Sequence, residues 1–580
     1  MTTNRRDLLK GAALGGVAAS LGACAREDAE PALEPDAVDP SITTRTIAEA
    51  EKLQGMAYTP AERAMMLEGL ENNLQSLAQL RQVTLANNLA PAQTFNPKLP
   101  SKKVGSQKNR LTQGGKYDQP LPTDDAAIAF ASVGQQGAWL RSGAITSARL
   151  TEIYLNRIAQ HNGALNCYIT VTADLARAQA AKADADFAEG RNRGPLHGVP
   201  YGLKDLADTK GVRTTWGATP YKERMPATDA DIVRKLQRAG AVLLGKTSCG
   251  ALAYGDQWFD ARTRNPWNPE EGSSGSSAGS ASATAAGLCG FSIGTETLGS
   301  IVSPSERCGT TGLRPTFGRV SRAGFMALCW SLDKVGPICR TVEDTALVLS
   351  EINGYDADDP SAARVGFTYD GAADISGMTV GYVPQWFEEG DAADKAALEA
   401  LNGLGVAVKE FPFPETPFDS LIQIVLVEAA AAFADLTLSG QDDQLVWQEA
   451  AAWPNTFRQA RFMSAVDYVQ IDRLRRKLMI EMSEAFEGFD ALIGPHYAGG
   501  ALLATNCTGH PQLALRAGYA QTPNRTRFGN SEQPVEGAET FRTPRGVSLW
   551  GDLFQEGKII AIGRQLEAAL GVAAQQPPGF

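Results

Sequence analysis

The stretch that decides the fold runs over residues 271–302 and reads EGSSGSSAGSASATAAGLCGFSIGTETLGSIV. Glycine and serine are abundant in it, so a flexible linker is the alternative interpretation. Its order argues against a linker. The small residues of 278–287 predict a closely packed helix, and residues 290–293 predict a strand that leads into a tight turn carrying a glycine. We therefore expect an ordered strand–turn element with a serine exposed at its tip.

This turn offers what acyl transfer to a serine requires. Ser300 follows the turn glycine Gly299 directly, and backbone N–H groups of the same turn can stabilise an oxyanion. The serine still needs a base, and the four histidines of the chain lie outside the motifs typical of serine hydrolases. A lysine is the natural replacement. Burial among apolar groups lowers its pKa from about 10.4, so that the neutral amine can accept a proton.

Lys204 meets this requirement. It ends the apolar run GVPYGLKD of residues 198–205, which predicts a buried strand. For the lysine alone, a strand-end residue that reaches solvent would be the better interpretation. Lys246, in the run LLGKT after another strand, competes for the same role, and we interpret it as structural.

The rest of the chain predicts an α/β protein. With 43% hydrophobic residues among 580, it can build a large core. A helix pattern over 233–240 precedes a strand over 241–244, and strand, helix and strand follow at 378–383, 392–404 and 406–411. Such alternation favours a sheet covered by helices on both faces.

Composition excludes several function classes. The net charge of −11 argues against nucleic acid, whose phosphates call for a basic face. None of the eight cysteines forms a C-x-x-C pair, so we expect no zinc or other metal and predict buried free thiols. The glycine-rich stretch holds neither a G-x-G-x-x-G nor a P-loop ending, and we expect no cofactor.

The N-terminus predicts export. Arg5 and Arg6 form a twin-arginine pattern, and an apolar run of small residues, 11–22, follows it within the predicted signal of residues 1–24. The run is too short to span a membrane and ends in LGAC, which resembles a lipobox. We expect a periplasmic protein or a lipoprotein tethered through lipidated Cys24. An ordinary cleaved signal with a chance cysteine is the alternative.

Three further segments follow the signal. Residues 25–45, rich in Asp, Glu, Pro and Ala, predict a solvated tether. Residues 46–123 predict an N-terminal helical extension and a long connection, with a capping box in TPAE at 59–62. Residues 124–575 predict the catalytic domain, and its helix-rich insertion at about 425–489 is of a kind that often shapes a substrate pocket.

With these residues in place, the chain resembles the amidase signature family of serine hydrolases. The resemblance covers about residues 125–570. It implies a large mixed, twisted β-sheet covered by helices on both faces, with a Ser–cis-Ser–Lys triad. Besides the glycine- and serine-rich stretch and the lysine strand, it rests on LLGKT (243–247), CGTTGLRPTFGRVS (308–321), DKVGP (333–337), RTVED (340–344) and TGHP (508–511).

The resemblance assigns the triad. Ser300 is the implied nucleophile, Ser276 the bridging serine and Lys204 the general base, and a cis peptide bond is implied between Gly275 and Ser276. The bridging hydroxyl would relay a proton between Ser300 and Lys204 and then back to the leaving amine. The implied reaction is hydrolysis of a linear amide through an acyl-enzyme.

The resemblance also covers the surroundings of the nucleophile. Thr297, Leu298 and Gly299 would supply oxyanion N–H groups. The family usually has glycine where this chain has Leu298 and arginine where it has Val302, and both departures are expected to alter the pocket.

The sequence says less about the substrate and the partners than about the triad. Tyr254, Trp258 and Ser277 are candidate substrate-binding residues, and the two aromatic rings weakly suggest an apolar or aromatic acyl group. An esterase or carbamate hydrolase of the same family is an alternative to an amidase, and so is a catalytically silent binding protein, although an intact triad speaks against silence. An exported chain without partner subunits would also have no access to charged transfer RNA, which argues against glutaminyl-tRNA synthesis.

Overall fold

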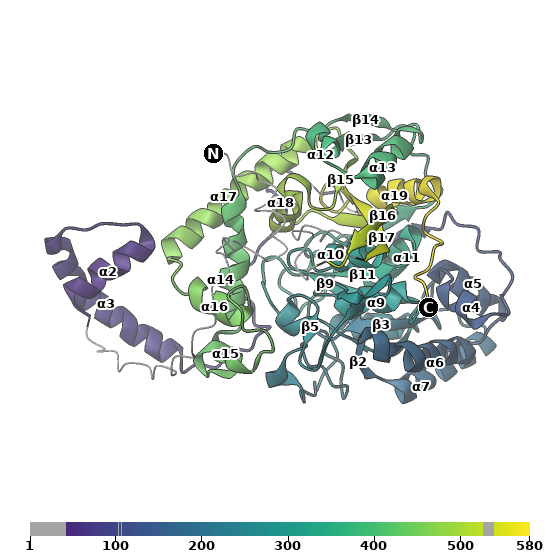
Figure 1. Cartoon of the computed structure of the whole chain (residues 1–580), viewed down its shortest axis with the longest axis horizontal. Coiled ribbons are helices and arrows are strands. Elements are labelled where there is room, and N and C mark those ends of the chain that lie inside the picture. The colour runs from purple at the N-terminus through teal and green to yellow at the C-terminus, as the bar shows by residue number, and fades with distance from the viewer. Residues whose placement is uncertain (1–41, 103, 106, 526–538) are drawn as a thin grey trace.

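A mixed sheet of eleven strands forms the centre of the protein (Figure 1). The computed structural model describes residues 42–102, 104–105, 107–525 and 539–580. The predicted α/β fold is confirmed. The strands, in their order across the sheet, are β14 (Ala407–Glu410), β13 (Thr379–Tyr382), β15 (Ala491–Pro495), β17 (Thr540–Trp550), β16 (Gln512–Pro523), β10 (Thr311–Arg314), β11 (Lys334–Cys339), β9 (Phe291–Glu296), β3 (Pro200–Lys204), β4 (Val242–Thr247) and β2 (Tyr168–Val171).

The pairing of β3 brings the lysine strand to the serine stretch. β3 runs parallel to β9, with Leu203 opposite Ile293, and parallel to β4 on its other side. Carboxyl ends of parallel neighbours meet at the same edge of a sheet, so Lys204 lies beside the last residues of β9. Three short ladders lie outside the main sheet: β1 (Arg110–Thr112) with β12 (Thr368–Asp370), β5 (Gln257–Trp258) with β6 (Ala261–Arg262), and β7 (Arg264–Asn265) with β8 (Asn268–Gly272).

Helices cover both faces of the sheet. α9 (Ala278–Ala285) and α10 (Val302–Cys308) pack on the face to which Ile338 points, in a small apolar cluster with Ala281 and Ile301. α11 (Val342–Ile352) and α19 (Glu556–Leu570) pack on the opposite face, where Leu513 contacts Gly563. Side chains of a strand alternate between faces, so the two helix pairs enclose the central strands.

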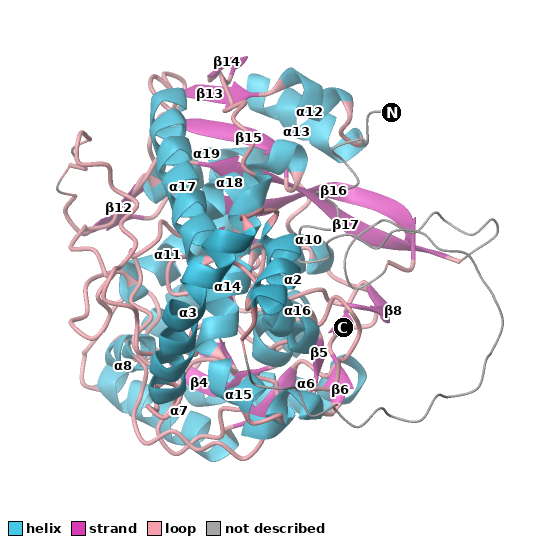
Figure 2. Ribbon diagram, turned by 90° about the vertical axis from the view of Figure 1, so that its left-hand side faces the viewer, coloured by secondary structure: helices cyan, strands magenta, loops and turns pink. Residues whose placement is uncertain are grey.

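The remaining helices surround this core. α14 to α17, from the predicted insertion, form the side of the body that faces the viewer in Figure 2. The elements are α4 (Asp125–Phe130), α5 (Val133–Ser142), α6 (Ser147–Leu165), α7 (Ala173–Ala188), α8 (Asp231–Arg238), α12 (Pro384–Glu388), α13 (Ala392–Asn402), α14 (Ile422–Ala432), α15 (Ala434–Leu438), α16 (Trp453–Ala460), α17 (Ala465–Ala485) and α18 (Ala501–Thr508), with 3₁₀ turns at Thr219–Tyr221, Ala251–Ala253, Asp419–Leu421, Gln441–Gln444 and Ala498–Gly500.

A helical hairpin precedes the body and lies to one side of it (Figure 1). It consists of α2 (Thr44–Gln54) and α3 (Pro60–Leu80). The predicted capping box is present, because Thr59 and Glu62 exchange hydrogen bonds at the start of α3. Arg63 and Glu51 form a bidentate ion pair that joins the two helices. The predicted signal, Cys24 and most of the predicted tether lie outside the described residues, and the domain boundaries stay predictions.

The cysteines agree with the sequence analysis. The seven cysteines in the described part of the chain are free and buried, as predicted. In the same ranges, no group of three or more His, Cys, Asp or Glu side chains is placed to hold a metal ion. Nor does any described helix combine the length and apolar character that a membrane span needs.

Candidate active site

Lys204 lies at the end of β3 with its amine surrounded by hydroxyl groups. The side chain is fully buried. Its Nζ donates to Ser276 Oγ at 2.8 Å, to Thr295 Oγ1 at 2.9 Å and to Ser277 Oγ at 3.1 Å. The lysine strand, the serine cluster and the end of β9 therefore converge on one nitrogen, as their pairing in the sheet requires.

The environment of Lys204 favours the neutral amine. Burial lowers the pKa of Lys204 to about 7, and the Cys249 thiol and the carboxylates of Asp333 and Glu296 only partly oppose this effect. The direct hydrogen-bond partners of the amine are hydroxyls and a carbonyl. These groups are uncharged, so they stabilise the protonated amine less than a carboxylate would. At neutral pH a large fraction of the lysine can therefore act as a base.

A lowered pKa alone does not identify the base, because two other buried lysines share it. Burial lowers the pKa of Lys246 to about 8 and that of Lys334 to about 7. However, Lys246 donates to Thr214 Oγ1 at 2.8 Å and to a backbone carbonyl, while Lys334 donates to the carbonyl of Leu332. The contact with Ser276 distinguishes Lys204.

The bridging serine is held against the nucleophile turn. The Gly275–Ser276 peptide bond is cis. A Cβ at Gly275 would lie 1.8 Å from the carbonyl oxygen of Gly255, so only glycine fits there. The next residue, Ser277, donates its N–H to the carbonyl of Ser300 at 3.0 Å. This bond ties the residue after Ser276 to Ser300.

The turn after β9 folds around a buried carboxylate. Glu296 accepts hydrogen bonds from the N–H groups of Ile301 at 2.8 Å and Val302 at 3.0 Å, and forms an ion pair with Arg314 at 2.9 Å. Burial alone would raise the pKa of Glu296, but the Arg314 guanidinium and the Val302 amide outweigh it and lower the pKa. The charged carboxylate fixes both ends of the turn that carries Ser300, the predicted nucleophile.

The tip of this turn presents Ser300 and unused donors. Gly299 has a φ of +85°, which glycine adopts without strain. Thr297 anchors the turn by donating its hydroxyl to Asp333 at 2.5 Å. No described residue accepts a hydrogen bond from the N–H group of Thr297, Leu298, Gly299 or Ser300. These amides are available to an oxyanion, although the assignment stays a prediction.

Two carboxylates and one threonine at this site were not singled out from the sequence. Glu296 and Asp333 hold the nucleophile turn, and Thr295 binds the lysine amine. The available signal was an acidic residue between small residues at the end of a buried strand, where an unpaired charge would be costly. Some of their partners lie far away in the sequence: Thr295 contacts Lys204, 91 positions away, and Glu296 contacts Asn506, 210 positions away.

A cavity of about 330 Å³ lies next to the end of β9. Thr295 and Thr297 form part of its wall, and Leu206, just after the lysine strand, forms another part. The loop Phe325–Trp330 supplies an apolar wall. None of Lys204, Ser276 and Ser300 lines this cavity, but Thr295, whose hydroxyl accepts a hydrogen bond from Lys204, does, so the cavity adjoins the candidate site.

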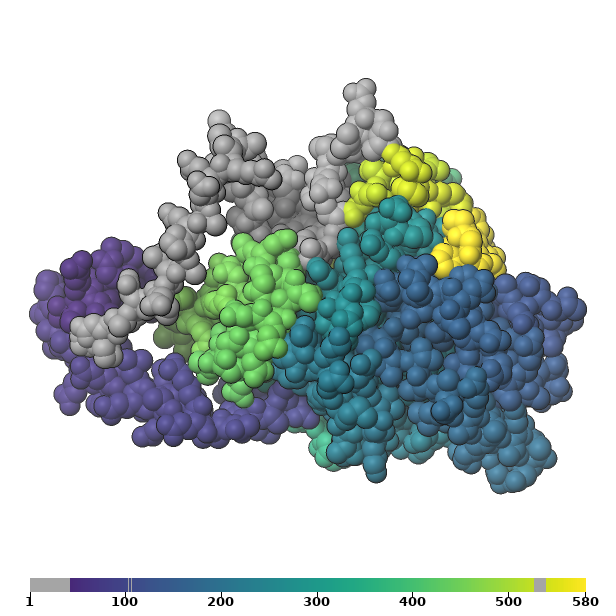
Figure 3. All heavy atoms as spheres, turned by 60° about the horizontal axis from the view of Figure 1, so that its bottom comes forward, coloured from purple at the N-terminus to yellow at the C-terminus, as the bar shows by residue number. Residues whose placement is uncertain are grey.

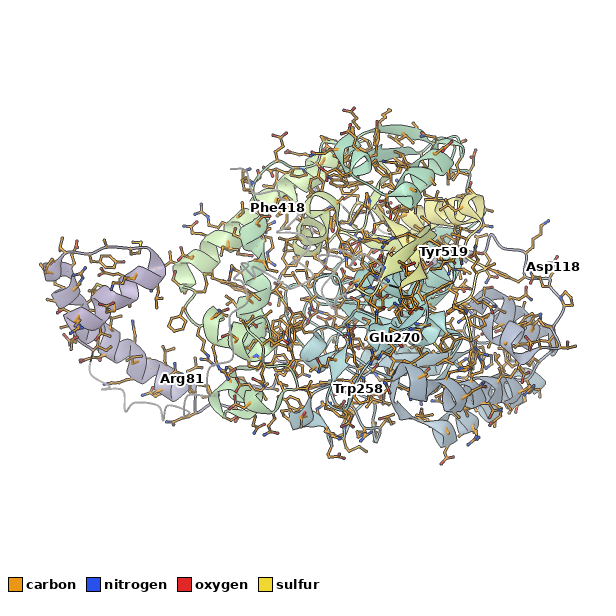
Figure 4. The ribbon with its side chains drawn as sticks, in the orientation of Figure 1. Arg81, Asp118, Trp258, Glu270, Phe418 and Tyr519 are labelled. Atoms are coloured by element: carbon orange, nitrogen blue, oxygen red, sulfur yellow. The ribbon has the colours of Figure 1, made fainter. Side chains whose placement is uncertain are left out.

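The predicted substrate-binding residues lie elsewhere. Tyr254 packs against Trp447 and Trp453, with ring centroids 4.8 and 4.9 Å away. Trp258, labelled in Figure 4, packs edge-to-face on Phe259. None of Tyr254, Trp258 and Ser277 lines the cavity, and Ser277 instead contacts the lysine. Their part in substrate binding stays a prediction.

Comparisons with known proteins agree with this geometry and identify the class as hydrolases of C–N bonds. The family model for Amidase matches residues 149–560, which is more than half of the chain. The chain belongs to the amidase family and is an amidohydrolase. The fold and family predicted from the sequence are thereby confirmed.

Individual relatives give the extent of the likeness. The glutamyl-tRNA(Gln) amidotransferase subunit of Methylobacillus flagellatus is 30% identical over 77% of this chain and 99% of its own length. The namesake from Roseiflexus is 41% identical, but the match spans 51% of this chain and 63% of that protein. The structure of peptide amidase from Stenotrophomonas maltophilia superposes with a TM-score of 0.65, at 29% identity over 78% of this chain and 98% of that one.

The prediction of export is contradicted by these relatives. The amidotransferase subunits among them belong to glutamyl-tRNA(Gln) amidotransferase, which is a cytoplasmic tRNA-modifying enzyme and not an exported protein. The predicted twin-arginine route and the periplasmic or lipid-anchored location are therefore wrong. Two arginines and a short apolar run are a much weaker signal than a match over most of the chain. The membrane tether through Cys24 finds no support either. Without export, the argument that the protein has no access to transfer RNA no longer holds.

Proposed function

We propose that this protein hydrolyses the C–N bond of an amide through an acyl-enzyme on Ser300, with Ser276 as proton relay and Lys204 as general base. The observation that carries the proposal is the 2.8 Å hydrogen bond between Lys204 Nζ and Ser276 Oγ, in a buried site beside the Ser300 turn. Esters and carbamates use the same acyl chemistry, and the preference for amides rests on the family.

The proton moves along the two serines in both halves of the reaction. Neutral Lys204 takes a proton from Ser276 Oγ as that oxygen takes one from Ser300 Oγ, which attacks the carbonyl carbon. The N–H groups of the turn stabilise the oxyanion. The relay then returns the proton to the leaving nitrogen, which departs as a neutral amine. Water repeats the sequence on the acyl-enzyme and regenerates Ser300.

The acyl-enzyme can be trapped directly. Acid quenching during steady-state turnover of an activated 4-nitrophenyl ester should leave the acyl group on the peptide that contains Ser300, detectable by mass spectrometry. Added hydroxylamine should divert the same intermediate to a hydroxamate, because it competes with water for the acyl group. Enzyme denatured before mixing is the control. Turnover without any acylated peptide, or an acyl group on another residue, would contradict the assignment.

The rate of amide hydrolysis should depend on pH through the lysine. Since Lys204 must be neutral to accept a proton, and its pKa lies at about 7, kcat/KM should rise about tenfold per pH unit below 7 and level off above it. Rates measured from pH 5 to 9 with acetanilide test this. A rate that falls as pH rises through 7 would contradict a basic role for the amine.

Membership of a larger amidotransferase assembly is the second candidate, because several relatives carry the name of such a subunit. In that case other protein chains would be its partners. The same trapping experiment separates the two, since a self-sufficient amidase acylates and turns over as the purified chain alone. Turnover that appears only in the presence of another protein would favour the assembly.

A further inference from the structure

The segment of residues 81–99 links the helical hairpin to the body; we call it the strap. Arg81, labelled in Figure 4, marks its start at the end of α3, and Figure 3 shows a continuous purple band from the hairpin to the body. The strap lies outside residues 149–560, which match the family.

Asn87 fastens the strap to two parts of the body at once. Its Nδ2 donates to the carbonyl of Ala327 at 2.9 Å and to that of Ala432 at 3.1 Å, and its Oδ1 accepts from the N–H of Ala327 at 2.8 Å. The Trp330 indole donates to the Asn87 carbonyl at 3.1 Å. One side chain and its backbone thus join the strap, the loop 325–330 and the end of α14.

A second anchor fixes the other end of the strap. Phe95 packs edge-to-face on Phe317 at 5.0 Å, and the guanidinium of Arg475 lies 4.4 Å above the Phe95 ring. Leu99 is buried. Held at both ends, the residues between Asn87 and Phe95 have a defined path across the body.

That path borders the cavity of the candidate active site. Asn88 and Ala90 line the same cavity as Thr295 and Thr297. Thr295 is the residue whose hydroxyl lies 2.9 Å from Lys204 Nζ. The strap and the threonine that contacts the catalytic lysine therefore border one shared space.

One side of the cavity suits a neutral, apolar group. Phe325, Met326, Leu328 and Trp330 supply much of its wall. Charged side chains also line the cavity, and some of them are paired within the chain: Arg322 with Asp359 at 3.1 Å and Asp208 with Arg224 at 2.7 Å. A charged substituent would have to compete with these ion pairs, whereas an alkyl or aryl group would gain from the apolar wall.

We infer that the strap determines substrate specificity: Ala90 limits the bulk of the apolar substituent that enters the cavity, and Asn87 is the positioning residue that holds the loop 325–330 in place. The inference rests on the proposed function, because it places that substituent beside the triad. It adds the substrate class, amides with one neutral alkyl or aryl group whose size the strap restricts.

The test compares specificity ratios in three variants. Ala90→Trp fills the cavity, Asn87→Ala releases the loop, and Gln93→Ala is the matched control, because Gln93 is exposed on the strap and outside the cavity wall. Two series of amides share acetamide as the smallest member. One extends the acyl group to hexanamide and decanamide, and the other extends the amine to acetanilide and N-acetyl-naphthylamine.

In one of the two series, Ala90→Trp should lower kcat/KM for the largest member about tenfold or more relative to acetamide, as exclusion from an apolar pocket does. Asn87→Ala should shift the same ratio the opposite way, and Gln93→Ala should leave it unchanged. Since the two cavity variants act in opposite directions, a general loss of folding cannot produce the expected pair of results.

Ratios that stay unchanged in both cavity variants would overturn the role of the strap, while amide turnover by the wild type would leave the proposed function standing. A second measurement covers the opposite outcome, in which the strap restricts the cavity but the protein does not hydrolyse amides. Labelling of Ser300 by sulfonyl fluorides of increasing size should show the same dependence on Ala90. Size-dependent labelling without amide turnover would support the strap and contradict the proposed amidase activity.

Discussion

Replacement of Ser300 by alanine should lower kcat for amide hydrolysis by about 10⁶-fold, the cost of deleting the nucleophile of a serine hydrolase. No other group among the described residues is placed to substitute for it. Ser276, the nearest hydroxyl of the relay, is 1% exposed and bonded to Lys204, whereas Ser300 stands at the tip of the turn with the unused N–H groups. The measurement is amine release from acetanilide over hours with purified protein.

A matched variant tests whether the loss of any buried hydroxyl in this region would lower the activity. Ser305→Ala removes another buried hydroxyl, five residues further on in α10, that has no hydrogen-bond partner among the described residues. Its kcat should stay within about twofold of the wild type, because the loss of an unpaired hydroxyl costs little. Ser300→Ala with nearly full activity would overturn the assignment of the nucleophile and with it the acyl-enzyme.

The secondary structure of the serine stretch was predictable because it depends on the local sequence pattern. The small residues predicted a helix where α9 forms, and the strand–turn pattern was realised in β9 and the turn that ends at Ser300. The strand that ends at Lys204 was predictable from its apolar run, but the role of the lysine followed only from the family resemblance, since the run alone favours a lysine that reaches solvent. A strand pairing then places the two together.

Much of the supporting shell could not be predicted, because many of its contacts join residues that are distant in the sequence. Glu296 depends on Arg314 and on the fold of its own turn, and Asn87 contacts residues more than two hundred positions away. The orientation of the aromatic residues near the signature could not be predicted for a related reason: composition does not say which way a ring points, and Tyr254 packs against its tryptophan neighbours. Leu298, expected to reshape the pocket, is 3% exposed and packs in the core.

Replacement of Lys204 by alanine should separate amides from esters. An amine is a poor leaving group until it is protonated, whereas a phenolate leaves without a proton. The relay that begins and ends at Lys204 is therefore needed twice for an amide. We expect kcat/KM to fall by about 10³- to 10⁴-fold for acetanilide but by only about 10- to 100-fold for phenyl acetate, given the usual size of general acid–base catalysis. The two substrates share their acyl group, so the ratio isolates the leaving group.

Lys246→Met provides the comparison, because Lys246 is equally buried and also has a lowered pKa, yet it donates to Thr214 and a backbone carbonyl and not to the bridging serine. Its loss should lower the melting temperature, since buried acceptors lose their donor, and should affect both substrates by the same factor. An equal loss for amide and ester in Lys204→Ala would contradict the relay and leave the lysine a structural role. A split in Lys204→Ala together with no split in Lys246→Met would show that the contact with Ser276, and not burial or charge alone, makes a lysine catalytic in this fold.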